Sequence, residues 1–384
     1  MQPVARSVVV LNRWRLLVLA AAAAAAFVPV SPDLVEELYS NGLYPPLQAF
    51  ITSWSNRTPL ALFDVLIAAV VVGWAALLVR DLSASRSRWI RVLVPMAVRT
   101  ATFAAALYLV FLVTWGLNYR RVPLEEKLQL DSRAVTPQAA VDLAIMAVSE
   151  LNRLAPGGRP AAEAAVSRID PALARAFEEA QRQLGAGRLA LPGRPKRTLL
   201  DGYFRAASVD GMTDPYFLET MAQSALLPVE RPMVVAHEWA HLAGFADEGE
   251  ANFVGWLTCL RGDEPARYSG WLFLYSETAQ GLGATDRARV SALLGPATRA
   301  DLTAIAQRMR AQTSPTVSAV GWRVYDQYLR ANGIEQGTRS YTDVVRLVLG
   351  TQLGSSARAA VTPAVSDQGG AGSRSRAPRA AWAP

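Results

Sequence analysis

Three long apolar stretches lie within the first 120 residues of this 384-residue chain, at residues 16–32, 60–79 and 100–119. The first and third carry no charged side chain, and the second carries only Asp64. A helix needs about 20 consecutive apolar residues to cross a bilayer, so three transmembrane helices are expected. The lipid bilayer is therefore the first predicted partner, and residues 1–120 form the predicted membrane domain.

The first apolar stretch also fits a cleaved signal peptide, because it follows a basic segment and contains a run of alanines. No clean cleavage site follows the apolar core, which favours a retained span.

Basic residues in the short connecting segments predict the orientation of the spans. Arginines occur in the N-terminal tail and between the second and third stretches, at positions 6, 13, 15, 80, 86, 88 and 91. Residues 31–59 contain only Arg57 against three acidic residues. The N-terminus is therefore expected in the cytoplasm and the large C-terminal part outside it, although Arg120 and Arg121 oppose this orientation.

The remainder of the chain has the composition of a soluble, mostly α-helical domain with a minor β component over residues 121–361. Helices are expected over residues 137–154 and 171–184, with Thr136 and Asp170 as their N-caps. The aromatic residues at positions 203, 204, 216 and 217 indicate one or two short strands. Residues 362–384 consist largely of Ala, Gly, Ser, Pro and Arg and are expected to be disordered.

The only two histidines of the chain lie in one window, His237-Glu238-Trp239-Ala240-His241. Residues four apart share one face of a helix, so both imidazoles can reach one Zn²⁺ ion. Glu238 is then placed as the general base that handles a water molecule on the ion. The helix is expected to begin at Pro232 and to end at Gly244.

A third zinc ligand must be a carboxylate, because no third histidine or zinc-binding cysteine pattern exists. Glu248 is the first choice, since it opens a second helix expected over residues 248–259 and has Asn252 one turn later as a second-shell partner. Glu250 and Asp247 are the alternatives.

Stabilising an oxyanion needs a donor besides the metal, and both histidines are already used. The candidates are Tyr203, Tyr216, Tyr268 and Arg231. A strand that precedes the motif helix is also placed to hold a peptide backbone by strand addition.

Nucleic acid is not an expected partner despite the formal charge of +7. The basic residues are scattered, without the clustered stripe that nucleic-acid binding needs. The single cysteine, Cys259, excludes an intramolecular disulfide framework.

The segment HEWAHLAGFADEGEANFVGWLTCL, residues 237–260, resembles the signature of a bacterial family of uncharacterised multi-spanning membrane proteins, a domain-of-unknown-function family expected to be zinc peptidases. Further matching parts are WGLNYR at residues 115–120, YSG at 268–270 and residues 332–341, so the resemblance covers roughly residues 30–350. The family usually has a basic residue at position 247, where this chain has Asp247.

The resemblance implies a multi-pass protein of the bacterial inner membrane with a zincin-like metallopeptidase domain, one zinc ion and a peptide or protein substrate. Two other functions stay open. The protein could be a catalytically silent zinc-binding membrane module, or a zinc amidohydrolase that acts on cell-wall amides.

Overall fold

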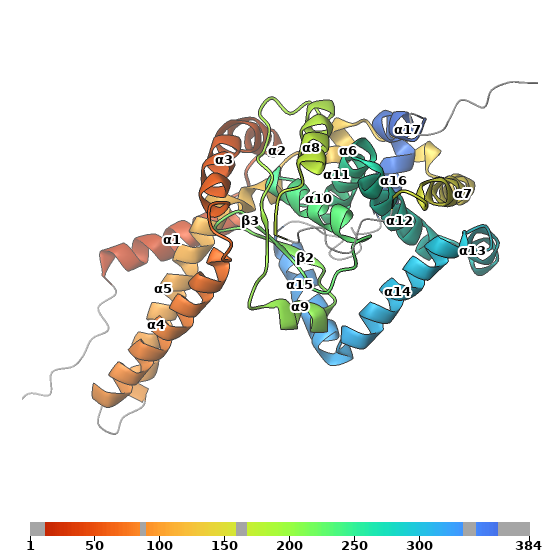
Figure 1. The fold of residues 1–384 in the computed structure, drawn as a ribbon. Helices are drawn as coiled ribbons and strands as arrows, with labels where there is room; N and C mark the ends of the chain where they lie inside the picture. The colour runs from red at the N-terminus through yellow and green to blue at the C-terminus, as the bar shows by residue number, and fades with distance from the viewer. Residues whose placement is uncertain (1–11, 85–89, 159–166, 333–342, 360–384) are drawn as a thin grey trace, which may run out of the picture.

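The computed structural model describes residues 12–84, 90–158, 167–332 and 343–359. Within these ranges the protein is mostly helical, with one small sheet, as expected from the sequence. An elongated helical hairpin projects from a larger helical body (Figure 1). The predicted disordered tail, residues 362–384, lies outside the described residues.

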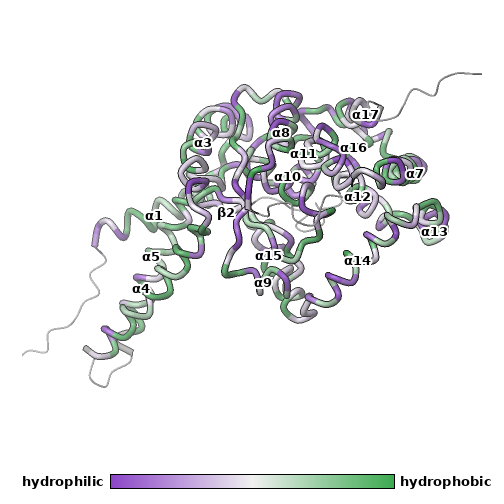
Figure 2. The backbone as a smooth tube through the Cα atoms, in the orientation of Figure 1, coloured by the Kyte–Doolittle hydropathy of each residue, from purple (hydrophilic) through white to green (hydrophobic). Residues whose placement is uncertain are grey.

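The N-terminal part contains the apolar helices. Its elements are α1 (Arg13–Phe27), α2 (Pro32–Leu34), the π-helix η1 (Val35–Leu43), α3 (Tyr44–Ser55), α4 (Leu62–Ala84), α5 (Ile90–Thr114) and the 3₁₀-helix η2 (Gly116–Arg120). Helices α4 and α5 form the projecting hairpin, which is largely hydrophobic (Figure 2).

Two of the three expected membrane spans correspond to helices that are long and apolar enough to cross a bilayer. They are Leu62–Ser83 and Leu93–Thr114, with mean hydropathies of 2.5 and 1.8. The predicted end of the third span, at residue 119, was wrong, because the helix ends at Thr114 and residues 116–120 form η2.

The first expected span is only partly supported. Helix α1 covers 15 residues. It reaches the length of a span only together with residues 32–55, which are bent away from it by 115°. The described chain therefore has two candidate spans, or three if the bent pair is counted as one.

The helical body is built around two consecutive helices, α10 (Arg231–Leu242) and α11 (Glu248–Arg261). Every residue of α11 from Glu248 to Leu260 is buried. Its neighbours include α8 (Pro171–Gln183), α12 (Glu264–Gly281) and α16 (Asp343–Gly350). The core contains three fully buried tryptophans, at positions 239, 256 and 271.

The other elements surround this core. They are α6 (Leu124–Lys127), the 3₁₀-helix η3 (Ser132–Ala134), α7 (Pro137–Leu154), α9 (Asp201–Ala207), α13 (Ala284–Ser291), α14 (Pro296–Gln312), α15 (Pro315–Ala331) and α17 (Gln352–Ala359). The predicted N-caps of α7 and α8 are confirmed, since Thr136 accepts from the Ala139 amide and Asp170 accepts from the Ala172 and Leu173 amides.

The sheet has three short strands in the order β1-β3-β2: β1 (Pro195–Lys196), β2 (Gly211–Asp214) and β3 (Glu219–Ala222). Strand β3 runs parallel to β1 and antiparallel to β2, so β2 is an edge strand. The strand prediction was right in kind but wrong in position. Tyr203 and Phe204 lie on α9, whereas Tyr216 and Phe217 lie in the turn between β2 and β3.

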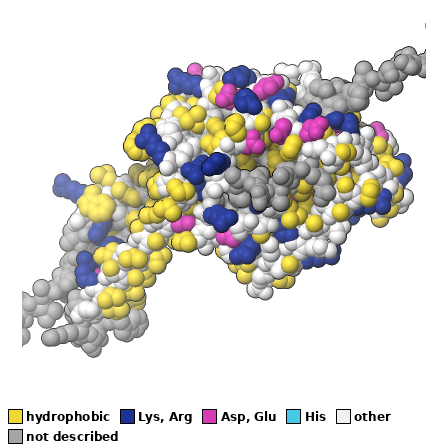
Figure 3. Space-filling model, viewed as in Figure 1, with side chains coloured by type: hydrophobic (Ala, Val, Ile, Leu, Met, Phe, Trp, Pro, Cys, Tyr) yellow, Lys and Arg dark blue, Asp and Glu magenta, His cyan; other side chains and the backbone are white. Residues whose placement is uncertain are grey.

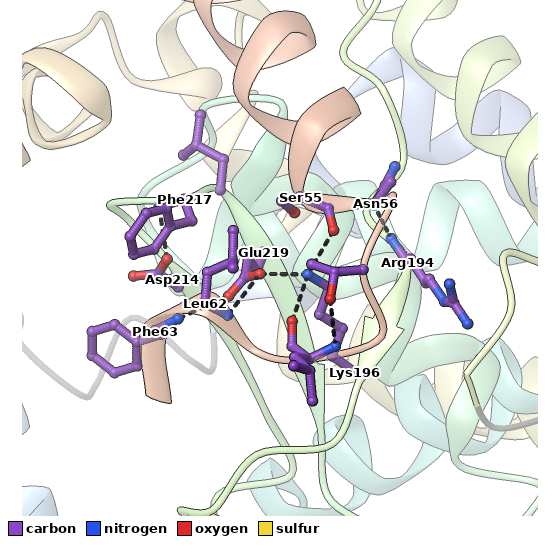
Figure 4. Close-up of polar contacts among 12 residues, drawn as sticks. Ser55, Asn56, Leu62, Phe63, Arg194, Lys196, Asp214, Phe217 and Glu219 are labelled. Carbon is purple, nitrogen blue, oxygen red and sulfur yellow. Dashed lines mark hydrogen bonds and ion pairs between the residues drawn. The ribbon is translucent and has the colours of Figure 1, made fainter. Parts of the chain in front are cut away.

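A buried ion pair fastens the hairpin to the sheet (Figure 4). Lys196 on β1 and Glu219 on β3 contact each other with both side chains fully buried. Glu219 also accepts from the Leu62 and Phe63 amides at 3.1 Å, which caps the N-terminus of α4. The Lys196 ammonium donates to the Ser55 and Leu60 carbonyls.

Candidate metal centre

Helix α10 carries both histidines and ends in a turn that the sequence prescribes. Gly244 has a φ of +84°, the left-handed conformation that glycine adopts most readily. The Gly244 amide donates to the His241 carbonyl at 2.9 Å and the Phe245 amide donates to the Ala240 carbonyl at 3.1 Å. The predicted C-terminal cap is therefore confirmed, and the chain doubles back at once into α11.

This turn also fixes the tautomer of His241. Its Nδ1 lies 2.7 Å from the Phe245 carbonyl oxygen, which can only accept a hydrogen bond. Nδ1 therefore carries a proton. In the neutral ring this leaves Nε2 as a free lone pair, which is the state that a metal ligand requires.

Three ligand atoms converge at one point. His237 Nε2 lies 3.1 Å from His241 Nε2, and Glu248 Oε2 lies 3.2 Å from the former and 3.6 Å from the latter. A tetrahedral ion with bonds of about 2.0–2.1 Å separates its ligand atoms by about 3.3–3.4 Å. The group could therefore hold a metal ion, and zinc fits its size and its two-nitrogen, one-oxygen donor set.

The buried atoms of the group also need a cation. Glu248 Oε2 is buried and faces the two imidazole nitrogens at 3.2 and 3.6 Å. Burial opposes the charged form of Glu248, yet the two imidazoles hold the pKa of its carboxyl far below the usual range. Burial alone would lower the pKa of His241, but the Glu248 carboxylate outweighs it and raises this pKa to about 9. The site therefore favours positive charge where its three ligands meet.

The two alternative carboxylates are engaged elsewhere. Glu250 is buried and accepts a hydrogen bond from the Leu124 amide of α6, and burial raises the pKa of its carboxyl to about 7. Asp247 is the N-cap of α11 and accepts from the Glu250 amide at 3.0 Å. Asn252 is buried one helical turn after Glu248. Of the three candidates, the structure brings only Glu248 to the histidines.

Glu238 follows His237 on α10, and its buried side chain contacts the edge strand β2. Its Oε2 is 2.8 Å from the Thr213 hydroxyl of β2. Gly211, on the same strand, approaches so closely that a Cβ there would lie 2.5 Å from Glu238 Oε1. Burial raises the pKa of the Glu238 carboxyl, an effect that the two histidines and Thr213 partly oppose. This carboxyl is thus held in place and made more basic than an exposed one.

The predicted oxyanion donors have different surroundings. Tyr268 is fully buried and donates to Asp301 at 2.7 Å, so its hydroxyl is directed toward α14. Arg231 begins α10, six residues before His237, which is about 9 Å along the helix axis. Tyr203 is 49% exposed on α9. Tyr216 is half-buried and stacks on Phe63. The contacts of Tyr268 and Tyr216 lead to α14 and to Phe63, and an oxyanion role for any of the four residues stays a prediction.

A tyrosine that the sequence did not indicate contacts the group. Tyr325 of α15 donates its hydroxyl to Glu248 Oε1, which leaves Oε2 for the metal. Tyr325 is stacked on Tyr328, and Tyr328 packs against Tyr119 of η2. Tyr325 and Glu248 are 77 positions apart in the sequence, so no local spacing could reveal this contact.

Side chains next to the apolar helices donate hydrogen bonds to backbone carbonyls at the C-terminal end of α10. Trp115 donates its indole N–H to the His241 carbonyl at 2.9 Å, and its ring lies edge-on to the His241 ring. The Tyr44 hydroxyl donates to the Leu242 carbonyl at 2.9 Å, and Arg121 donates to the Gly244 carbonyl at 3.0 Å. These side chains supply further donors to the carbonyls at the C-terminus of α10 and in the turn that follows it.

The fold and the site together define a mostly helical protein with an apolar helical hairpin and a largely buried His–His–Glu group. Residues 39–349 match the family described as "Protein of unknown function (DUF3810)", and the chain belongs to this family. No curated protein and no solved structure matches the chain.

Proposed function

We propose that this protein is a membrane-bound zinc metallopeptidase with a zincin-like domain. The observation that carries the proposal is the convergence of His237, His241 and Glu248 beside a buried Glu238. This set has three ligands for the metal and a separate carboxylate for proton transfer, which is the composition of a catalytic rather than a closed structural zinc site.

Bound zinc would lower the pKa of a water molecule and withdraw electrons from a substrate carbonyl. Glu238 would accept the proton of the attacking water and deliver it to the leaving amine. Thr213 and Gly211 support this role because they hold the Glu238 carboxyl from the side of β2. Tyr325 would keep Glu248 in its ligating orientation through Oε1.

Strand β2 is the proposed binding site for the peptide backbone. It pairs with β3 along one edge, and no other described strand pairs with it. A peptide added to the free edge would run beside Glu238, since Gly211 and Thr213 both contact that side chain. Main-chain hydrogen bonds would then supply affinity with little dependence on sequence.

We further propose that the protein is a multi-pass protein of the bacterial inner membrane, with a cytoplasmic N-terminus and an extracytoplasmic metal centre. The distribution of arginines supports this topology, which needs α1 as a third span, because the two apolar helices of the hairpin alone would return the chain to its starting side. An alkaline phosphatase fusion after Thr362 should be active, because this enzyme requires an extracytoplasmic location. An inactive fusion together with an active cytoplasmic reporter would contradict the orientation.

Hydrolysis of a peptide library by the purified full-length protein tests the peptidase assignment. Glu238→Gln should abolish cleavage and retain zinc, because the general base is lost and the ligands are not. Glu250→Gln is the matched control, since Glu250 is also a buried glutamate near the site but faces α6. It should retain both zinc and cleavage.

Three results would contradict parts of this proposal. Full peptide cleavage by the Glu238→Gln variant would remove Glu238 from the mechanism. Cleavage of cell-wall fragments without any cleavage of peptides would instead identify an amidohydrolase. A zinc-loaded wild-type protein that cleaves neither would favour a non-catalytic zinc module.

A further inference from the structure

Helix α3 has its polar and apolar faces reversed relative to a helix on the surface of a soluble domain. The side chains that face the body are Tyr44, Gln48, Thr52 and Ser55, all of them buried. They follow one another at steps of four, four and three residues, which is one face of a helix. Such a surface helix ordinarily buries its apolar stripe and exposes its polar one.

Three of the four side chains on this buried face form hydrogen bonds to the body. Gln48 accepts from the Leu191 amide and donates to the Leu191 carbonyl at 3.0 and 2.9 Å. Thr52 donates to the Leu218 carbonyl at 3.0 Å, and Tyr44 donates to the Leu242 carbonyl of the metal-site helix. These contacts fix the rotation of α3, so its other face must point outward.

Exposed apolar side chains follow the outward side from the end of α2 to the end of α3, with the exposed Glu37 and Asn41 of η1 beside them. Leu38 is 65% exposed, Phe50 is 63% exposed and Trp54 is 56% exposed, with Leu34 and Leu43 between half and two-thirds exposed as well. Residues five positions apart lie on nearly the same side of a π-helix, because it contains more residues per turn than an α-helix. Leu38 and Leu43 of the nine-residue η1 therefore share this side. Hydrophobic side chains gather over this part of the surface (Figure 3).

This apolar face is continuous with the membrane hairpin. The chain passes from Trp54 through the exposed Leu60 directly into α4, whose Val65 is exposed in turn. Helices α1, α3, α4 and α5 lie on the same side of the molecule (Figure 1). The Arg57 guanidinium lies 4.1 Å from the centre of the Trp54 ring, and tryptophan and arginine are the residues that anchor proteins at the lipid headgroup level.

We propose that η1 and α3 lie in the membrane interface, with their apolar face in the lipid and their polar face against the metal-site helix. This inference rests on the proposed membrane location of the hairpin. We expect lipid to cover this face, because the face is continuous with the apolar surface of the hairpin. The Tyr44 hydroxyl of α3 donates to the carbonyl of Leu242, the residue after His241. Helix α3 would therefore lie between the metal-binding group and the bilayer surface.

Fluorescence quenching in reconstituted vesicles tests the depth of this face. The native Cys259 is fully buried, so single cysteines introduced at exposed positions can be labelled selectively. Full-length Phe50→Cys and Leu38→Cys variants would carry an environment-sensitive fluorophore in phosphatidylcholine vesicles. Val72→Cys on the hairpin is the lipid control and Ala288→Cys on α13 is the water control, both at exposed positions.

A quencher attached to the lipid chains should remove most of the emission from labels at positions 38, 50 and 72, and iodide in the water should quench only the label at 288. If positions 38 and 50 respond to iodide while 72 responds to the lipid quencher, the interfacial helix is refuted and the membrane hairpin stands. Shielding of 38 and 50 from both quenchers would show a protein partner instead. Iodide quenching at 72 would overturn the membrane location itself.

Discussion

Gly255 sets the distance between the two helices that carry the proposed metal ligands. It lies on the face of α11 that also carries Glu248, seven residues earlier. A Cβ at position 255 would lie 3.0 Å from the His237 amide nitrogen and 3.1 Å from His237 Cα, whereas ordinary contacts are 3.4–4 Å. Both atoms belong to the backbone, so α10 and α11 must separate by a few tenths of an ångström to admit the added carbon.

The Gly255→Ala variant should therefore bind zinc more weakly. Zinc sites tolerate displacements of about 0.2 Å in ligand distance. Overpacking a core costs about 1–3 kcal/mol. If the metal-free protein relieves this strain by separating the helices, zinc binding must restore it, and the Kd rises by about 5- to 150-fold. Competition against a chromophoric chelator measures this change in the detergent-purified protein.

Two glycines in α12 provide controls. A Cβ at Gly281 meets nothing within 4 Å, so Gly281→Ala should bind zinc like the wild type. A Cβ at Gly270 would lie 2.7 Å from Cys259 Cβ, so Gly270→Ala overpacks the core without touching the motif helix. It should lower stability more than zinc affinity. An unchanged Kd for Gly255→Ala, or an equal loss for Gly270→Ala, would refute the proposed role of helix spacing.

Three further predictions follow from the contacts of the site and the hairpin. Tyr325→Phe removes the hydrogen bond that orients Glu248, so the zinc Kd should rise about 10- to 100-fold in the same chelator assay. Glu219→Gln leaves the Lys196 ammonium buried without its counter-charge, which costs about 3–5 kcal/mol, so the midpoint of thermal unfolding followed by tryptophan fluorescence should fall by roughly 6–20 °C. The pKa of His241 is raised from 6.5 to about 9, so its protonation stabilises the metal-free fold fully below pH 6.5 and this stabilisation is lost as pH rises through 9. The unfolding midpoint of chelator-treated protein should fall across that window, and an unchanged or rising midpoint would contradict this assignment.

The metal-binding group could be predicted from the sequence because its determinants are local. The two histidines are one helical turn apart, Gly244 reverses the chain, and Glu248 opens the next helix. Spacing alone did not separate Glu248 from Glu250 and Asp247. Their different roles depend on the Leu124 amide and on the N-cap of α11, which are properties of the folded chain.

The two apolar helices long enough to cross a membrane were also predictable, since length and hydropathy are local properties. The orientation of residues 32–55 against the body was not predictable from the sequence. The sequence does not show which face of α3 packs against the body. Only the structure reveals that Gln48 and Thr52 are buried there, while the leucines and aromatic residues of this segment are exposed. The Tyr325 contact and the support from Thr213 likewise join segments that are far apart in sequence.

Zinc content per chain is the measurement that tests the central claim most directly. The full-length protein, purified without chelator and analysed by inductively coupled plasma mass spectrometry, should hold one zinc ion. His237→Ala and Glu248→Gln should lose it, and the matched Glu250→Gln variant should retain it, because Glu250 faces the Leu124 amide instead of the histidines. A wild-type protein without zinc after reconstitution, or a Glu248→Gln variant that keeps a full equivalent while Glu250→Gln loses it, would contradict the proposed centre.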